Sequence, residues 1–108
     1  MKPALSTILS EIVTERARQD ELHPWDKLEI GVTNYSKQFH ATEANELKRL
    51  NDKQESDGYA YIDTLILEEY HETFAETDPV KQETEAIQLA ALAIKFVEWS
   101  RAKRGAKC

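Results

Sequence analysis

Two consecutive helical patterns in the second half of the chain carry glutamate where a soluble helix normally carries leucine. The stretch from Leu67 to Lys95, LEEYHETFAETDPVKQETEAIQLAALAIK, divides at Asp78-Pro79. Aspartate before proline is a typical helix start, because the carboxylate caps free backbone N–H groups and proline fits the first helical position. We therefore expect one helix to end before Asp78 and another to begin at Pro79.

The first pattern covers residues 59–76 and has one face of isoleucine and aromatic side chains. At 3.6 residues per turn, Glu69 and Glu76 project into this apolar face, and Glu72 lies on its flank. Glu68 projects to the opposite side, so we interpret it as a surface residue. The pattern thus predicts that several glutamates of one helix face the protein rather than water.

The second pattern covers residues 79–102 and repeats the anomaly. Glu85 projects between Leu92 and Phe96, and Gln88 lies on the same flank. A buried carboxylate without a partner costs several kcal/mol, and carboxylates that converge from two helices repel one another. A divalent cation is the simplest way to hold them together, and oxygen ligands favour Mg²⁺ or Mn²⁺ over Zn²⁺.

A second interpretation of these glutamates needs no metal. Acidic side chains near a helix boundary often reach outward to water, or they pair with a basic side chain. Arg16, Arg18 and Lys81 are candidate partners here. The sequence leaves both interpretations open.

Length and composition favour a single helical domain. The chain has 108 residues with 41% hydrophobic residues, three glycines and three prolines, which suits one all-α domain over residues 1–108. We expect a four-helix bundle with a turn at Ser56–Gly58, a loop over 24–33 and a basic tail over 101–108. The expected helices span residues 3–22, 34–52, 59–76 and 79–102.

Charge and hydropathy exclude several classes of protein. A net charge of -6 argues against a nucleic-acid-binding protein, which needs clustered cations to displace counterions from phosphate. The longest apolar run, residues 86–99, is too short to cross a membrane. The single cysteine, Cys108, cannot form an internal disulfide. We therefore expect a soluble, cytoplasmic protein.

The histidines and tryptophans do not indicate a second site. His23, His40 and His71 are scattered, without the spacing of a zinc site, and we interpret His71 as a surface residue. Trp25 and Trp99 are expected to anchor the core rather than to stack on bases, although either could lie at the mouth of a pocket.

The acidic segments resemble the motifs of the MazG-like all-α nucleoside triphosphate pyrophosphohydrolases. That family carries Glu-Glu-x-x-Glu on one helix and Glu-x-x-Asp on the next. Residues 68–72, EEYHE, are similar to the first motif, and residues 85–88, EAIQ, are similar to the second except that Gln88 replaces the aspartate. Residues 15–20, ERARQD, resemble the first segment of small phage-type relatives.

The resemblance implies a MazG-type fold and Mg²⁺-dependent hydrolysis of a nucleoside triphosphate to a monophosphate and pyrophosphate, with Mn²⁺ as an alternative metal. It implies a homodimer or homotetramer, in the cytoplasm of a bacterial host if the chain is encoded by a phage. The implied metal ligands are Glu69, Glu72, Glu85 and Gln88, and the implied catalytic residues are Glu68, Glu69 and Glu72. Either Glu68 or Glu76 would activate the water. The implied substrate-binding residues are Arg16, Arg18, Gln19 and Lys81.

Gln88 leaves an alternative open, because an amide supplies a ligand oxygen but no negative charge. The alternative is a catalytically weak or inactive helical protein of the same fold that binds a nucleotide or a protein partner. A purely structural bundle with salt-bridged acidic groups is a third hypothesis.

Overall fold

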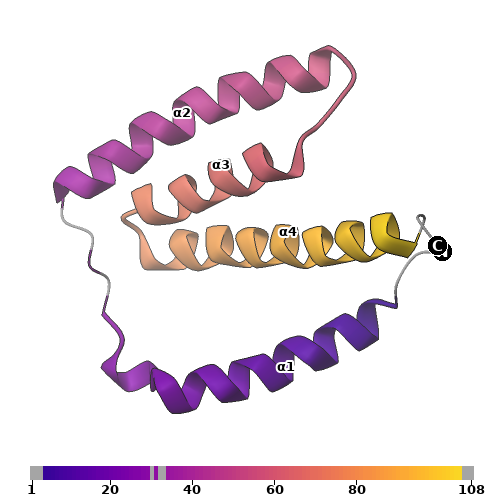
Figure 1. The fold of residues 1–108 in the computed structure, drawn as a ribbon. Helices are drawn as coiled ribbons and strands as arrows, with labels where there is room; N and C mark the ends of the chain where they lie inside the picture. Colours follow the sequence, from indigo (N-terminus) through magenta and orange to yellow (C-terminus); the bar gives the residue numbers. More distant parts are fainter. Residues whose placement is uncertain (1–3, 30, 32–33, 106–108) are drawn as a thin grey trace. The chain divides into compact units, whose positions relative to one another are not determined.

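The computed structural model describes residues 4–29, 31 and 34–105. In these residues it contains four α-helices, one short 3-10 helix and no strand (Figure 1). The α-helices are α1 (Leu5–Leu22), α2 (Asn34–Ser56), α3 (Ile62–Ala75) and α4 (Pro79–Gly105), and the 3-10 helix η1 is Trp25–Lys27. The expectation of an all-α protein with four helices is confirmed. None of the helices in this part of the chain combines the length and apolar character that a membrane span needs.

The chain forms two compact units. The first contains residues up to Gly31 together with those from Ile94 onward, and the second contains Val32 to Ala93. The start expected for the first helix, Pro3, and the end of the expected basic tail, residues 106–108, lie outside the described residues.

The predicted end of the second helix at Asp52 and the predicted start of the third at Tyr59 were wrong, and the end of α2 explains both errors. The N–H of Gly58 donates to the carbonyl of Glu55 at 3.1 Å, and that of Tyr59 donates to Gln54 at 2.9 Å. With a φ of 99° at Gly58, these two bonds make a Schellman closure, which requires a residue that tolerates the left-handed region. Helix α2 therefore continues past Asp52 to the residues before this glycine. Tyr59 is held in the closure, so α3 begins only at Ile62.

The second unit is built on α2 and α3, which lie side by side in opposite directions (Figure 1). Ala44 is the buried apolar residue of this contact, at 7% exposure. The other buried residues are polar and paired. His40 Nδ1 lies 2.7 Å from His71 Nδ1, and Asn51 bonds to α3. The interpretation of His71 as a surface residue was wrong, since α2 covers that side of α3.

The turn between α3 and α4 is held by its own side chains. Glu76 Oε1 accepts from the backbone N–H groups of Thr77 and Asp78, both at 3.1 Å. Asp78 Oδ2 accepts from the N–H of Lys81 at 3.2 Å, which confirms the predicted cap of α4. Gln82 Nε2 donates to the carbonyl of Thr73 at 3.0 Å and so fastens the start of α4 to the end of α3.

Among the described residues of the first unit, Ile8 is buried, at 1% exposure. An ion pair of 2.6 Å joins Arg101 near the end of α4 to Glu11 of α1. Trp25 is 75% exposed and Trp99 is 49% exposed, so the expectation that they anchor the core was wrong. Trp99 instead makes a cation–π contact with Lys103, whose ammonium group lies over the ring, 5.8 Å from its centre.

Candidate functional site

Three glutamates of the second unit converge between α3 and α4. One carboxylate oxygen from each of Glu69, Glu72 and Glu85 lies within 4.8 Å of the others, and all three side chains are half-buried. Glu69 and Glu72 share a face because they are three residues apart on α3. Glu85 faces them from the second turn of α4, which the Asp78 cap and the Gln82 bond hold in place. We call these three residues the acidic cluster.

The acidic cluster is electrostatically strained when all its members are ionised. Loss of hydration on burial is the largest cause that raises the pKa of Glu69 to about 7, followed by a hydrogen bond with Glu85 and the charge of Glu85. Burial also raises the pKa of Glu72 to about 8, with contributions from a hydrogen bond with Glu68 and the charge of Glu69. Each raised pKa means that binding of a proton, or of another positive charge, is favoured at the acidic cluster.

Glu68 contributes a fourth carboxylate beside the cluster. It is half-buried and its Oε1 accepts from Asn51 Nδ2 at 2.7 Å. Its interpretation as a surface residue was wrong, because the side of α3 opposite the apolar stripe is covered by α2 rather than by water. Its hydrogen bond with Glu72 connects the cluster to α2.

Gln88 reaches the cluster through its amide. With the amide nitrogen turned toward Glu69, it donates to Oε1 at 3.1 Å and to Oε2 at 3.3 Å. Rotation of the amide by half a turn brings its oxygen to the same place. Gln88 therefore lies against the cluster, where it can act as a donor or as a ligand.

The predicted substrate-binding residues have other surroundings. Arg16 pairs with Asp20 at 2.8 Å, Arg18 donates to Glu15 at 2.9 Å, and Gln19 donates to the same carboxylate at 3.5 Å. These residues are exposed on α1 and belong to the first unit, whereas the acidic cluster belongs to the second. Lys81 is exposed in the first turn of α4.

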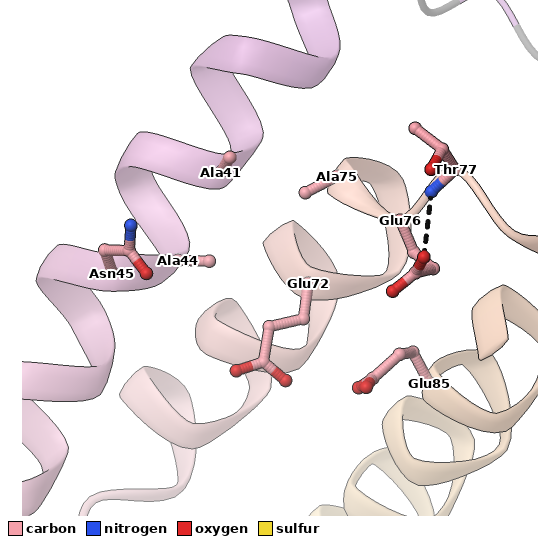
Figure 2. A pocket seen from close by; sticks show the side chains of 8 residues that line it. All are labelled: Ala41, Ala44, Asn45, Glu72, Ala75, Glu76, Thr77 and Glu85. Carbon is pink, nitrogen blue, oxygen red and sulfur yellow. Dashed lines mark hydrogen bonds between the residues drawn. The ribbon is translucent and has the colours of Figure 1, made fainter.

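A pocket of about 270 Å³ opens beside the cluster, within the second unit (Figure 2). One wall consists of residues of α2, namely Ala41, Ala44 and Asn45. The rest is lined by Glu72, Ala75, Glu76, Thr77 and Glu85. Figure 2 shows the carboxylates of Glu72 and Glu85 extended toward each other, and the methyl groups of Ala41 and Ala75 facing across the gap between α2 and α3.

Sequence reasoning missed the contribution of α2 to this pocket. A signal was present, because Ala41, Ala44 and Asn45 stand three and four residues apart and so share one face of a helix. Small side chains on such a face leave space beside a neighbouring helix.

Comparison of the whole chain with protein-family models, with curated proteins and with solved structures gives no match.

Proposed function

We propose that the chain is a metal-dependent nucleoside triphosphate pyrophosphohydrolase that holds Mg²⁺, or Mn²⁺, at the acidic cluster. The observation that carries the proposal is the convergence of Glu69, Glu72 and Glu85 within 4.8 Å, together with the raised pKa of Glu69 and Glu72. Three carboxylate oxygens at one point suit a hard divalent cation. The resemblance of residues 68–72 and 85–88 to the MazG-like motifs supplies the substrate class.

The hypothesis of a structural bundle with salt-bridged acidic groups requires basic partners for the acidic cluster. In residues 4–29, 31 and 34–105, no basic side chain pairs with Glu69, Glu72 or Glu85. The cluster thus lacks, within this part of the chain, the basic partner that such a hypothesis requires.

The side chains present fit such a metal and the reaction. Glu69, Glu72 and Glu85 would hold the ion, and the amide oxygen of Gln88 would complete the set. A bound Mg²⁺ supplies charge neutralisation for the phosphates and lowers the pKa of a coordinated water. Hydrolysis adds one water across the anhydride between the α and β phosphates, so a nucleoside monophosphate and pyrophosphate leave.

Glu68 is the better of the two candidate bases for that water. Glu76 already accepts two backbone N–H groups of the turn. Glu68 is hydrogen-bonded to Glu72, beside the cluster, and its Oε1 accepts from Asn51 Nδ2 at 2.7 Å. Asn51 is therefore a positioning residue, and Glu68 receives the proton of the water.

The test is release of pyrophosphate from a panel of ribo- and deoxyribonucleoside triphosphates with Mg²⁺. Glu69→Gln keeps the size of the side chain but removes its charge, so it should abolish pyrophosphate release. Glu83→Gln, an exposed position of α4, is the matched control and should keep full activity. Equal activity of the Glu69 variant and the wild type would exclude the proposed metal site.

Gln88 favours a second candidate, a protein of this fold that binds a metal–nucleotide complex with little or no turnover. An amide in place of the fourth carboxylate lowers the charge that holds the ion. In that case Mg²⁺ with nucleotide would raise the melting temperature without producing pyrophosphate.

The proposal includes a homodimer or homotetramer. Its support is the exposure of large apolar residues on α4, since Val80 is 73% exposed and Ile87 is 63% exposed on the same helical face. Association of copies would remove these side chains from water. Light scattering of the purified protein measures the mass, and a monomer at all concentrations would refute this part.

A further inference from the structure

We infer that the alanine-lined half of the pocket beside the cluster holds the base of the nucleotide, and that Asn45 reads the edge of that base. The inference rests on the proposed function, which places only the phosphates. It adds a specificity-determining residue and a class of preferred substrates.

The pocket has two walls of different chemistry (Figure 2). Glu72 and Glu85 form one wall, and phosphate groups can approach these carboxylates only together with a cation. Ala41, Ala44 and Ala75 form the other, and their methyl groups offer an uncharged surface for van der Waals contact. A nucleotide has the same division into a charged and an uncharged end, so the phosphates belong at the carboxylates and the base belongs at the alanines.

The volume of the pocket is suited to one nucleotide base. Its volume of about 270 Å³ is at the small end of ligand sites, which commonly reach about 300–1,000 Å³. It therefore has room for a base but not for a complete nucleoside triphosphate. Longer side chains in place of Ala41 or Ala44 would fill it, which gives the two alanines of α2 a function in the site.

Asn45 supplies the polar contact at the rim of this wall. It is exposed on α2, and none of the hydrogen bonds recorded for the described residues uses its amide. An amide presents a donor and an acceptor side by side, which matches the edge of a base in two hydrogen bonds. A polar group without a partner among the described residues, beside the methyl groups of the alanines, is suited to select a ligand.

The remaining polar groups of the pocket favour one class of base. Glu76 lines the pocket, and its Oε2 is left as an acceptor while Oε1 holds the turn. An acceptor attracts the exocyclic amino group of cytosine or adenine, and it repels the keto oxygen that uracil and thymine carry in place of the amino group of cytosine. We expect cytidine triphosphate to be a better substrate than uridine triphosphate.

The test compares three ligands with wild type, Asn45→Ala and Ala41→Leu. The ligands are cytidine triphosphate, uridine triphosphate and inorganic triphosphate, each with Mg²⁺. Inorganic triphosphate reports on the metal and phosphate site alone, because it has no base. Thr42→Ala is the matched control, since the Thr42 hydroxyl donates to the carbonyl of Gln38 on its own helix at 3.1 Å and does not line the pocket.

For Asn45→Ala we expect the KM for cytidine triphosphate to rise about three- to tenfold, as for the loss of one or two neutral hydrogen bonds. The preference over uridine triphosphate should shrink, and the inhibition constant of inorganic triphosphate should not change. Ala41→Leu should raise KM for both nucleotides and again spare inorganic triphosphate.

Two results would overturn the inference. One is an unchanged base preference in Asn45→Ala, and the other is an equal loss of affinity for inorganic triphosphate and nucleotides in Ala41→Leu. Either result would show that the base does not bind in this pocket. Release of pyrophosphate by the wild type would still support the proposed function. If the wild type neither released pyrophosphate nor bound a Mg²⁺–nucleotide complex, the proposed function would fail and the inference with it.

Discussion

Replacement of Glu72 by glutamine should stabilise the metal-free protein at high pH. The pKa of Glu72 is raised to about 8 in the folded protein, from 4.5 in the unfolded chain. Between these two values the folded state binds more protons than the unfolded state, so the free energy of unfolding of the wild type falls as pH rises from about 4.5 to about 8. Glutamine removes the charge that causes this loss.

The structure sets the size of the effect. In a dry site, a pKa raised from 4.5 to about 8 corresponds to about 5 kcal/mol of repulsion and lost hydration. Glu72 is only half-buried, so water screens most of this energy, and we expect about 1–2 kcal/mol at pH values above 8. For a chain of this size the gain corresponds to a melting temperature higher by roughly 5–10 °C.

Thermal unfolding followed by far-ultraviolet circular dichroism measures this gain, with a chelator present at about pH 5 and about pH 9. Near pH 5 the carboxyl group of Glu72 is protonated and neutral, so glutamine should change the melting temperature little. Glu83→Gln, exposed on α4, should show no gain at either pH. A gain of equal size at both pH values, or a loss at high pH, would refute the electrostatic reasoning.

Three further predictions address the metal, the contact between α2 and α3, and the start of α4. Mg²⁺ at about 100 times the Kd that it has near pH 9 should raise the free energy of unfolding at that pH by about 2.7 kcal/mol. The same concentration should give a smaller gain near pH 6, because the ligands must lose their protons, and Glu85→Gln or a chelator should remove the gain in thermal scans. Asn51→Ala should cost about 1–3 kcal/mol in urea unfolding, since Asn51 is 3% exposed and the substitution removes its hydrogen bonds with the carboxylate of Glu68 and the hydroxyl of Thr64. Asp78→Ala should cost about 1 kcal/mol in the same assay, through loss of the N-terminal cap of α4.

The sequence predicted the four helices because the helical spacing of the apolar residues stops where the helix-breaking residues stand. It also predicted which glutamates meet, since Glu69, Glu72 and Glu85 stand on the helical faces that projection assigned to the interior. Both results depend on one helix at a time, where 3.6 residues per turn fixes the direction of each side chain.

The errors concern the contact between two helices. Projection treats polar residues as facing water, but Thr64, Glu68 and His71 form a polar face of α3 that packs on α2. The matching face of α2 carries His40, Ala44 and Asn51, spaced by four and seven residues. Each polar residue has a partner on the other helix, so burial does not leave it unsatisfied. Such complementarity is visible only when the two faces are read together.

Position 88 can be explained by the charge of the cluster rather than by loss of function. Three carboxylates already exceed the charge of one divalent ion, and a fourth would add repulsion whenever the metal is absent. With its nitrogen turned toward Glu69, the amide of Gln88 instead donates to that carboxylate at 3.1 Å. Rotation of the same amide presents an oxygen ligand when a cation binds. Under the proposed function, glutamine at this position lowers the affinity for the metal but reduces the repulsion between the carboxylates when no metal is bound. The number of ligands stays the same.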